Sequence, residues 1–218
     1  MMAIDERVIV ETVTGMGLAG NEEGLIPAFG LYLTNHYADF YNRISFGVLG
    51  ALVRENPELT EDAVALLTEA AHVCAFHTFG GIMASVEWDA LVQPMIESRE
   101  DWVLGMMAVV NAFGWGRFRV AELLPGERLV VELRDSYESS GYLESYPRAD
   151  GPRCFLANGG MAGLMNLVYQ GDITRRPTLT EELYREVFSD PRSFRSRERL
   201  CTAKGDSHCE FVVERMQG

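Results

Sequence analysis

The stretch ERLCTAKGDSHCEFVV at residues 198–213 constrains the fold of this chain more than any other segment. Within it, Cys201 and Cys209 stand at equal distances from Gly205, which forms a turn signal together with Asp206. If strands pair across this turn, the two cysteines lie opposite each other, where Cβ atoms are about 4.5–5.5 Å apart. That separation suits two sulfurs on one zinc ion, with Zn–S bonds of about 2.3 Å. The segment therefore predicts a C-terminal β-hairpin that presents two thiols to a metal.

Two more residues can complete the set of donors. Glu198 precedes Cys201 by three residues, so in a flat strand it would point to the opposite face, and a bulge or the strand end must turn it toward the thiols. Cys154 is expected at the start of a helix, where free N–H groups lower the pKa of a thiol and favour the thiolate that a metal requires. We therefore predict a zinc site formed by Cys154, Glu198, Cys201 and Cys209.

Other interpretations of these residues remain open. A Cys201–Cys209 disulfide is sterically possible, but four cysteines in 218 residues are not typical of a secreted disulfide scaffold, and a reducing compartment disfavours the bond. The cysteines can also be unrelated core residues, because free cysteine often behaves as a small apolar side chain. His208 could replace Glu198 as the fourth donor, but it ranks second because adjacent strand residues face opposite ways.

A second metal pair is conceivable on an earlier helix. Cys74 and His77 are one helical turn apart, and residues at this spacing share a side of a helix. The apolar pattern favours a packing role instead, because Leu67, Ala70, Ala71 and Cys74 recur at the three-to-four spacing of a buried helical face. We therefore expect Cys74 to lie in the core.

Composition disfavours several function classes. Nineteen basic residues oppose 32 acidic ones, and the net charge of −13 repels phosphate groups, so neither nucleic acid nor an anionic membrane is an expected partner. No apolar run is long enough to cross a bilayer. The first residues, MMAIDERVIV, lack the basic and apolar regions of a signal peptide, which predicts a cytoplasmic protein. Because 47% of the residues are hydrophobic, we predict one large core and a single domain over 1–218.

The order of the expected elements indicates the fold class. Helical patterns dominate to about residue 114, and alternating apolar residues then predict a β-hairpin around Pro125-Gly126. This order lacks the strand–helix alternation of a parallel sheet, so it predicts an α+β fold with helices packed on one face of an antiparallel sheet. The expected helices are 25–56 (one or two), 60–81 capped by Thr60, 101–113, 154–170, and 178–188 opened by a capping box of Thr178 and Glu181; residues 8–13 are a short strand or a helix start; and the expected hairpins are 115–134 and the C-terminal segment.

Several motifs resemble a known family. The pattern Glu-x-x-Cys-x-x-x-Gly-Asp-x-x-Cys-x-Phe, present here from Glu198 to Phe211, is typical of the 4-vinyl reductase domain. Arg153-Cys154-Phe155 with the glycines that follow, the segment AFGWG at 112–116, and Asp135-Ser136-Tyr137-Glu138 resemble the same family. The likeness covers about residues 100–215, and the helical first half carries no matching motif. This domain occurs in a bacteriochlorophyll-synthesis protein, in archaeal stand-alone proteins, and as the sensor half of phenol- and xylene-responsive transcription activators.

The resemblance carries expectations about structure and ligands. It implies a fold shared with small subunits of the TRAPP vesicle-tethering complex, which are usually dimeric. In the aromatic sensors three cysteines and a glutamate hold one zinc beside a buried ligand pocket, and the matching residues here are the four predicted above. An aromatic residue in the Ser-aromatic-Glu motif contacts the ligand in those sensors, and Tyr137 stands at that position. A longer insert between Gly171 and Glu198 departs from the sensors and leaves the ligand class open.

Other aromatic residues are candidates for a ligand pocket. Aromatic residues at helical spacing are mostly core, and this applies to Trp88 and Trp102. Trp115 lies where a helix is expected to give way to a strand, and with Phe113 it is the better candidate for contact with a ligand.

The resulting functional hypothesis is a zinc-stabilised sensor-type domain for a small hydrophobic or aromatic molecule, which forms a homodimer and signals through a protein partner. A closed site with four protein donors leaves no position for water, so the zinc would be structural. The alternative is an enzyme or an accessory subunit in the synthesis of tetrapyrroles or other hydrophobic metabolites, and a third possibility is a TRAPP-like scaffold without a ligand. The enzyme ranks lower because no catalytic residue and no site for a hydride-carrying cofactor is evident in the sequence.

Overall fold

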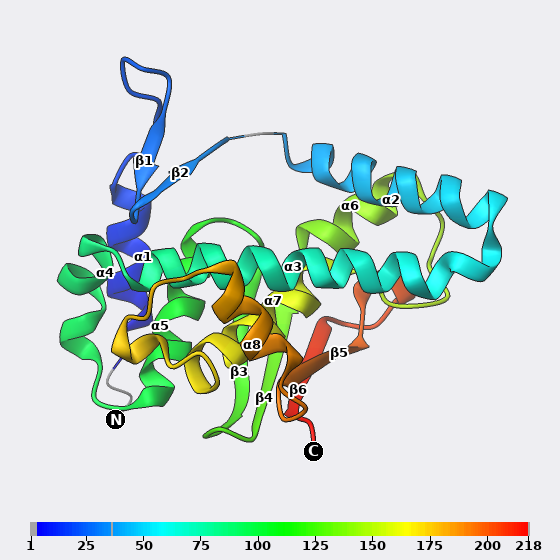
Figure 1. Cartoon of the computed structure of the whole chain (residues 1–218). Coiled ribbons are helices and arrows are strands. Elements are labelled where there is room, and N and C mark those ends of the chain that lie inside the picture. The colour runs from blue at the N-terminus through cyan, green and yellow to red at the C-terminus, as the bar shows by residue number, and fades with distance from the viewer. Residues whose placement is uncertain (1–3, 36, 218) are drawn as a thin grey trace.

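The computed structural model describes residues 4–35 and 37–217 (Figure 1). The first three residues of the segment considered for a signal peptide lie outside this range. The α-helices are α1 (Glu6–Gly15), α2 (Ala38–Glu55), α3 (Thr60–Met83), α4 (Val86–Leu91), α5 (Arg99–Ala112), α6 (Tyr137–Ser145), α7 (Phe155–Tyr169) and α8 (Glu181–Ser189). The strands are β1 (Ile26–Ala28), β2 (Leu31–Leu33), β3 (Arg117–Leu124), β4 (Arg128–Arg134), β5 (Phe194–Leu200) and β6 (Cys209–Arg215). Short 3₁₀ turns lie at Pro57–Leu59, Gln93–Met95, Ile173–Arg175 and Thr202–Lys204.

The second half of the chain forms a four-stranded antiparallel sheet. Its strand order is β3-β4-β6-β5, so the two predicted hairpins lie side by side with β4 paired to β6. Phe118, Val131 and Phe211 are among the apolar residues that are buried on the side of the sheet that faces the helices. The opposite face carries ion pairs such as Arg119–Glu132 and Arg199–Glu210. The α+β class with an antiparallel sheet is confirmed.

Helices cover one face of this sheet in two layers. The helices α5 and α7 pack directly on the strands, and α3 packs against α7 (Figure 1). The contact between α3 and α7 is close because Gly159 has no side chain: a Cβ there would lie 2.2 Å from the Thr68 carbonyl oxygen. Above these layers, α2 contacts both α3 and α6.

The N-terminal segment differs from its prediction. Residues 26–33 form a hairpin in place of the start of a helix, and its two-residue loop is Phe29-Gly30. Both loop residues have positive φ, 53° and 68°, which is the backbone that matches the twist of paired strands. A phenylalanine rarely adopts this conformation, so the sequence contains no ordinary turn signal here. The segment 8–13, for which strand and helix were both considered, lies within α1.

The buried face of α3 also differs from its prediction. Ala71 is buried as expected, but Leu67 is only half-buried, and Ala70 and Cys74 are exposed. The core placement of Cys74 was therefore wrong. The helix packs on α7 through small residues such as Ala75, and small side chains give a weak apolar pattern in the sequence.

The predicted caps of two helices are wrong, and one of these helices also begins later than predicted. The helix α8 begins at Glu181 and is capped by Thr180. The Thr180 hydroxyl oxygen accepts a hydrogen bond from the Leu183 N–H at 3.2 Å. The predicted capping box of Thr178 and Glu181 is therefore wrong. The helix α3 begins at Thr60, but the Thr60 hydroxyl donates to the Pro57 carbonyl and does not cap the helix. The short helices α4 and α6 were not anticipated. Among the described residues, no helix has both the length and the apolar character that a membrane span requires.

Candidate functional site

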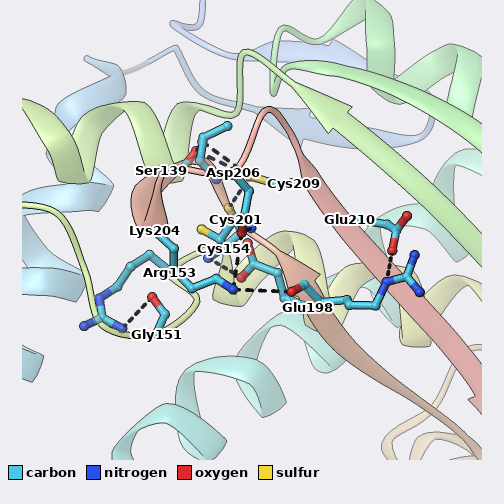
Figure 2. A network of polar contacts seen from close by, with 12 residues as sticks. Ser139, Gly151, Arg153, Cys154, Glu198, Cys201, Lys204, Asp206, Cys209 and Glu210 are labelled. Atoms are coloured by element: carbon cyan, nitrogen blue, oxygen red, sulfur yellow. Dashed lines mark hydrogen bonds and ion pairs between the residues drawn. The ribbon is translucent and has the colours of Figure 1, made fainter.

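Three elements bring the predicted metal ligands together. Cys154 is the N-cap residue of α7, Cys201 directly follows β5, and Cys209 is the first residue of β6. The 3₁₀ turn and Gly205 separate the two hairpin cysteines, and Gly205 has a φ of +95°, which a residue with a side chain adopts rarely. Figure 2 shows the three sulfurs and the Glu198 carboxylate converging between these elements.

A β-bulge turns Glu198 toward the thiols. In the register of β5 with β6, Glu198 pairs with Phe211, but Leu200 pairs with Glu210, so β5 contains one extra residue at Arg199. An extra residue reverses the alternation of side chains beyond it. This places Glu198 and Cys201 on the same side, as the metal-site prediction required.

The four predicted ligands form one cluster. Their donor atoms all lie within 4.8 Å of one another, and the Sγ atoms of Cys154 and Cys209 are 3.5 Å apart. Sulfurs on one tetrahedral ion with Zn–S bonds of about 2.3 Å lie roughly 3.8 Å apart, so this spacing fits shared coordination. Cys154, Cys201 and Cys209 have no exposed surface. The cluster is therefore close enough and dry enough to hold a metal ion.

The Glu198 carboxylate gives a direct test of that fit. One oxygen, Oε2, accepts a hydrogen bond from the Cys154 N–H at 2.9 Å. The other, Oε1, is buried and has no hydrogen-bond partner among the described residues. A buried carboxylate oxygen without a partner is costly, and a cation beside the three sulfurs would satisfy it. The residues present thus fit a metal ion.

The electrostatics of the cluster also favour a cation. Hydrogen bonds from Cys154 and then Cys201 lower the pKa of Cys209. Burial raises the pKa of Cys154 well above its ordinary value and also raises the pKa of Glu198. The expected lowering of the Cys154 pKa at a helix start was therefore wrong, because burial outweighs the helix terminus. A divalent ion would oppose the raised pKa values of Cys154 and Glu198, because it stabilises the charged forms.

Part of the surroundings of the cluster comes from the start of α6. The Ser136 hydroxyl lies 3.3 Å from the Cys154 sulfur, and the Ser139 hydroxyl lies 3.6 Å from the Cys209 sulfur. Between them, Glu138 is buried and its two oxygens accept hydrogen bonds from the N–H groups of Leu156 and Ala157, each at 2.9 Å. Glu138 therefore caps α7 beside Cys154, although burial raises its pKa to about 8.

The three predicted ligand-contacting residues line one cavity. This cavity has a volume of about 300 Å³ and lies between α2, the start of α6 and the loop between α5 and β3. The Tyr137 ring packs against Trp115 and Tyr41, with ring centroids 5.8 Å apart in each pair. The lining residues are Thr34, Asn35, Tyr41, Phe113, Gly114, Trp115, Tyr137 and Leu156.

Part of this lining was not anticipated from the sequence. Thr34, Asn35 and Tyr41 come from a segment interpreted as helix without a motif, and only the fold brings them to the cavity. Leu156 follows Cys154 by two residues and links the cavity to the metal cluster, but a leucine at a helix start carries no functional signal.

The remaining candidates lie outside the cluster. The His208 ring contacts the Ser207 hydroxyl at 2.9 Å and is not among the grouped donor atoms, so it does not replace Glu198. Cys74 contacts Thr78 at 3.6 Å and forms no donor cluster with His77 in the described part of the chain. Trp88 and Trp102 are buried core residues whose rings pack against each other, as expected.

Comparison of the sequence with protein-family models and with curated proteins finds no match. Comparison with solved structures finds similarity to the crystal structure of the phenol-responsive sensory domain of the transcription activator PoxR, solved with phenol. The TM-score is 0.61 at 16% sequence identity, over 96% of this chain and 89% of that chain. This similarity establishes the fold: the chain has the α+β architecture of that sensory domain. The resemblance to the 4-vinyl reductase and TRAPP families stays a prediction.

Proposed function

We propose that this chain is a zinc-stabilised sensory domain that binds a small aromatic molecule in the cavity beside its metal cluster. The observation that carries the proposal is that Phe113, Trp115 and Tyr137 line a single cavity of about 300 Å³. This volume lies at the lower end of the roughly 300–1,000 Å³ range of small-molecule sites. The phenol-responsive domain of similar fold supports a small phenol as the class of ligand.

Zinc is the ion that the donor set favours. Thiolates select zinc over harder cations such as magnesium and calcium, and three cysteines with one carboxylate complete a tetrahedral site. Such a site has no open position for water, so the ion would stabilise the fold and take no part in a reaction. It would tie the start of α7 to the hairpin of β5 and β6.

The start of α6 connects the metal cluster to the cavity. Ser136 contacts the Cys154 sulfur, Tyr137 lines the cavity, and Glu138 caps α7. Loss of the ion would therefore disturb the residues on either side of Tyr137. We expect the metal-free protein to bind aromatic ligands more weakly than the metal-loaded protein.

A homodimer that signals to another protein completes the proposal. Ile44 and Val48 lie one turn apart on α2 and are 50% and 64% exposed, and a partner surface would bury these apolar side chains. Sedimentation equilibrium measures the mass of the purified protein directly. A monomer at every concentration would remove the dimer from the proposal.

Thermal melting with phenol tests the central claim. A ligand at 100 times its dissociation constant stabilises the native state by about 2.7 kcal/mol. For a chain of this size, each kcal/mol raises the melting temperature by about 2–4 °C. We expect phenol to raise the melting temperature of the metal-loaded protein in a saturable manner. If neither phenol nor any other small aromatic compound does so, the binding proposal fails, and turnover of such a compound with a reductant would favour the enzyme alternative.

Replacing Tyr137 with phenylalanine should weaken phenol binding. The Tyr137 hydroxyl makes no hydrogen bond to other described residues, and the ring lines the cavity, so this hydroxyl is available to a ligand. A hydrogen bond contributes about 0.5–1.5 kcal/mol, so we expect Tyr137→Phe to lower phenol affinity roughly 3–10-fold. Isothermal titration calorimetry measures this change.

Tyr41→Phe is the matched control. The Tyr41 ring lines the same cavity, but its hydroxyl is buried without accessible surface. Burial raises its pKa, a nearby Glu138 adds to this, and Ser45 opposes it. Because this hydroxyl cannot reach a ligand, we expect Tyr41→Phe to leave the affinity unchanged. Equal losses in the two variants would show that Tyr137 has no special role.

A further inference from the structure

Gly160 is a glycine that packing does not explain. The neighbouring glycines of α7 allow α3 to approach: a Cβ on Gly159 would lie 2.2 Å from the Thr68 oxygen, and one on Gly163 would lie 2.6 Å from the Ala75 Cβ. Gly160 is buried too, yet a Cβ there would have no heavy atom of the surrounding residues within 4 Å. Glycine inside a helix destabilises it relative to alanine, so its presence beside open space calls for another reason.

The open space beside Gly160 is a small apolar chamber. Its volume of about 40 Å³ exceeds the roughly 10–15 Å³ that one water-sized probe occupies. The polar groups in its wall, the Cys74 thiol and the Thr78 hydroxyl, contact each other at 3.6 Å. The remaining wall is apolar, and such a space takes apolar groups more readily than water. The lining residues are Ala71, Cys74, Ala75, Thr78, Phe79, Trp115, Leu156 and Gly160.

The chamber adjoins the cavity of the proposed function. Trp115 and Leu156 line both spaces. A ring bound between Tyr137 and Trp115 would therefore have the chamber within reach of a short substituent.

We propose that the chamber receives an apolar substituent of the aromatic ligand, and that Gly160 sets the largest substituent that the site accepts. This inference rests on the proposed function and makes it more specific. The ligand class becomes a phenol that carries a short alkyl chain. The polar end lies in the larger cavity, and the alkyl chain lies between α3 and α7.

A series of alkylphenols tests the proposal. The probes are phenol, 4-methylphenol, 4-ethylphenol and 4-propylphenol, with affinities measured by isothermal titration calorimetry on metal-loaded protein. Each methylene that enters an apolar space raises affinity about fourfold. We expect affinity for the wild-type protein to rise along the series until the chamber is full. In Gly160→Ala, the affinity for phenol should stay within about threefold of wild type, and the affinity for the longest bound chain should fall roughly tenfold or more.

Gly50→Ala is the matched control for the change of glycine to alanine. Gly50 lies on α2, is exposed, and a Cβ there also has no neighbour within 4 Å, but it does not line the chamber. This variant gains the same helix propensity and should keep the full dependence on chain length. A loss of chain-length dependence in both variants would contradict the role of Gly160.

Reactivity of Cys74 gives a second measurement that needs no substitution. Of the four cysteines, all within the described residues, Cys74 alone is exposed, and it lies in the chamber wall. We expect the longest alkylphenol that binds to slow the reaction of Cys74 with a maleimide, and phenol at equal saturation to slow it less. Equal protection by both probes would count against an alkyl chain in the chamber.

The outcomes separate this inference from the function on which it rests. If phenol binds but Gly160→Ala changes all affinities equally or leaves them unchanged, the chamber has no role in selectivity and the inference alone fails. If no member of the series binds wild-type protein, the proposed function fails and the inference fails with it.

Discussion

Replacing Cys201 with serine is expected to abolish metal binding and to leave the chain unfolded near room temperature. A structural zinc contributes about 10–16 kcal/mol of apparent binding free energy, which is folding free energy. The whole stability of a domain is about 5–15 kcal/mol. A metal ion in the cluster would tie α7 to the β5–β6 hairpin through Cys154, Cys201 and Cys209, so loss of one thiolate would weaken this link. Far-ultraviolet circular dichroism and elemental analysis of the purified variant measure the two losses.

Cys74→Ser is the control for this prediction. Cys74 is exposed and lies outside the cluster, so the variant should keep one metal ion per chain and the wild-type melting temperature. Chelator added to wild-type protein tests the same claim without a substitution and should lower the melting temperature steeply. Reduced wild-type protein that contains no metal, and that melts at the same temperature with and without chelator, would contradict the proposed zinc site.

The metal cluster could be predicted because its signal is local. The spacing of Cys201 and Cys209 about a Gly-Asp turn determines their approach, and the need for a bulge near Glu198 follows from the alternation of side chains along a strand. Cys154 lies far away in the sequence. The residues alone gave two reasons to include it among the metal ligands: its expected position at a helix start and the affinity of thiols for metal ions. The resemblance to a known family supported its place in the set.

The cavity could be predicted only in part, because its walls come from distant segments. Tyr137, Trp115 and Phe113 stand in motifs, but Tyr41 reaches the cavity only through the path of α2. That path follows the β1–β2 hairpin, whose loop at Phe29-Gly30 uses a positive φ at a phenylalanine. No propensity rule places a hairpin there, and the buried Phe29 ring packs against Phe113, a contact that only the folded chain provides.

The helix faces were the other limit of sequence reasoning. A pattern of large apolar residues identifies a buried face, but α3 and α7 meet through alanines and glycines, which are common on every face. Cys74 was therefore assigned to the core although it is exposed. The same small residues determine how closely the two helices approach, and they carry a second prediction with a large effect.

Gly159→Ala is expected to destabilise the protein strongly. The new Cβ would lie 2.2 Å from the backbone oxygen of Thr68 and 2.6 Å from the Cβ of Ala71, and neither atom can rotate away, so α3 and α7 must move apart. Overpacking a core costs about 1–3 kcal/mol and more where backbone must shift, while the gain in helix propensity returns at most about 1 kcal/mol. We expect a net loss of about 2 kcal/mol, which lowers the melting temperature by roughly 4–8 °C. Urea unfolding of the metal-loaded protein measures the free energy.

Gly160→Ala on the next position of the same helix gives the matched comparison. Its Cβ meets no atom within 4 Å, so only the helix propensity changes, and the free energy of unfolding should stay equal or rise by up to about 1 kcal/mol. The two substitutions are chemically identical and adjacent, so their difference isolates the close approach of α3 from any general effect of alanine in α7. Equal stabilities for the two variants would mean that α3 does not pack on α7 through Gly159, and the layer that supports both the cavity and the metal cluster would have to be arranged differently.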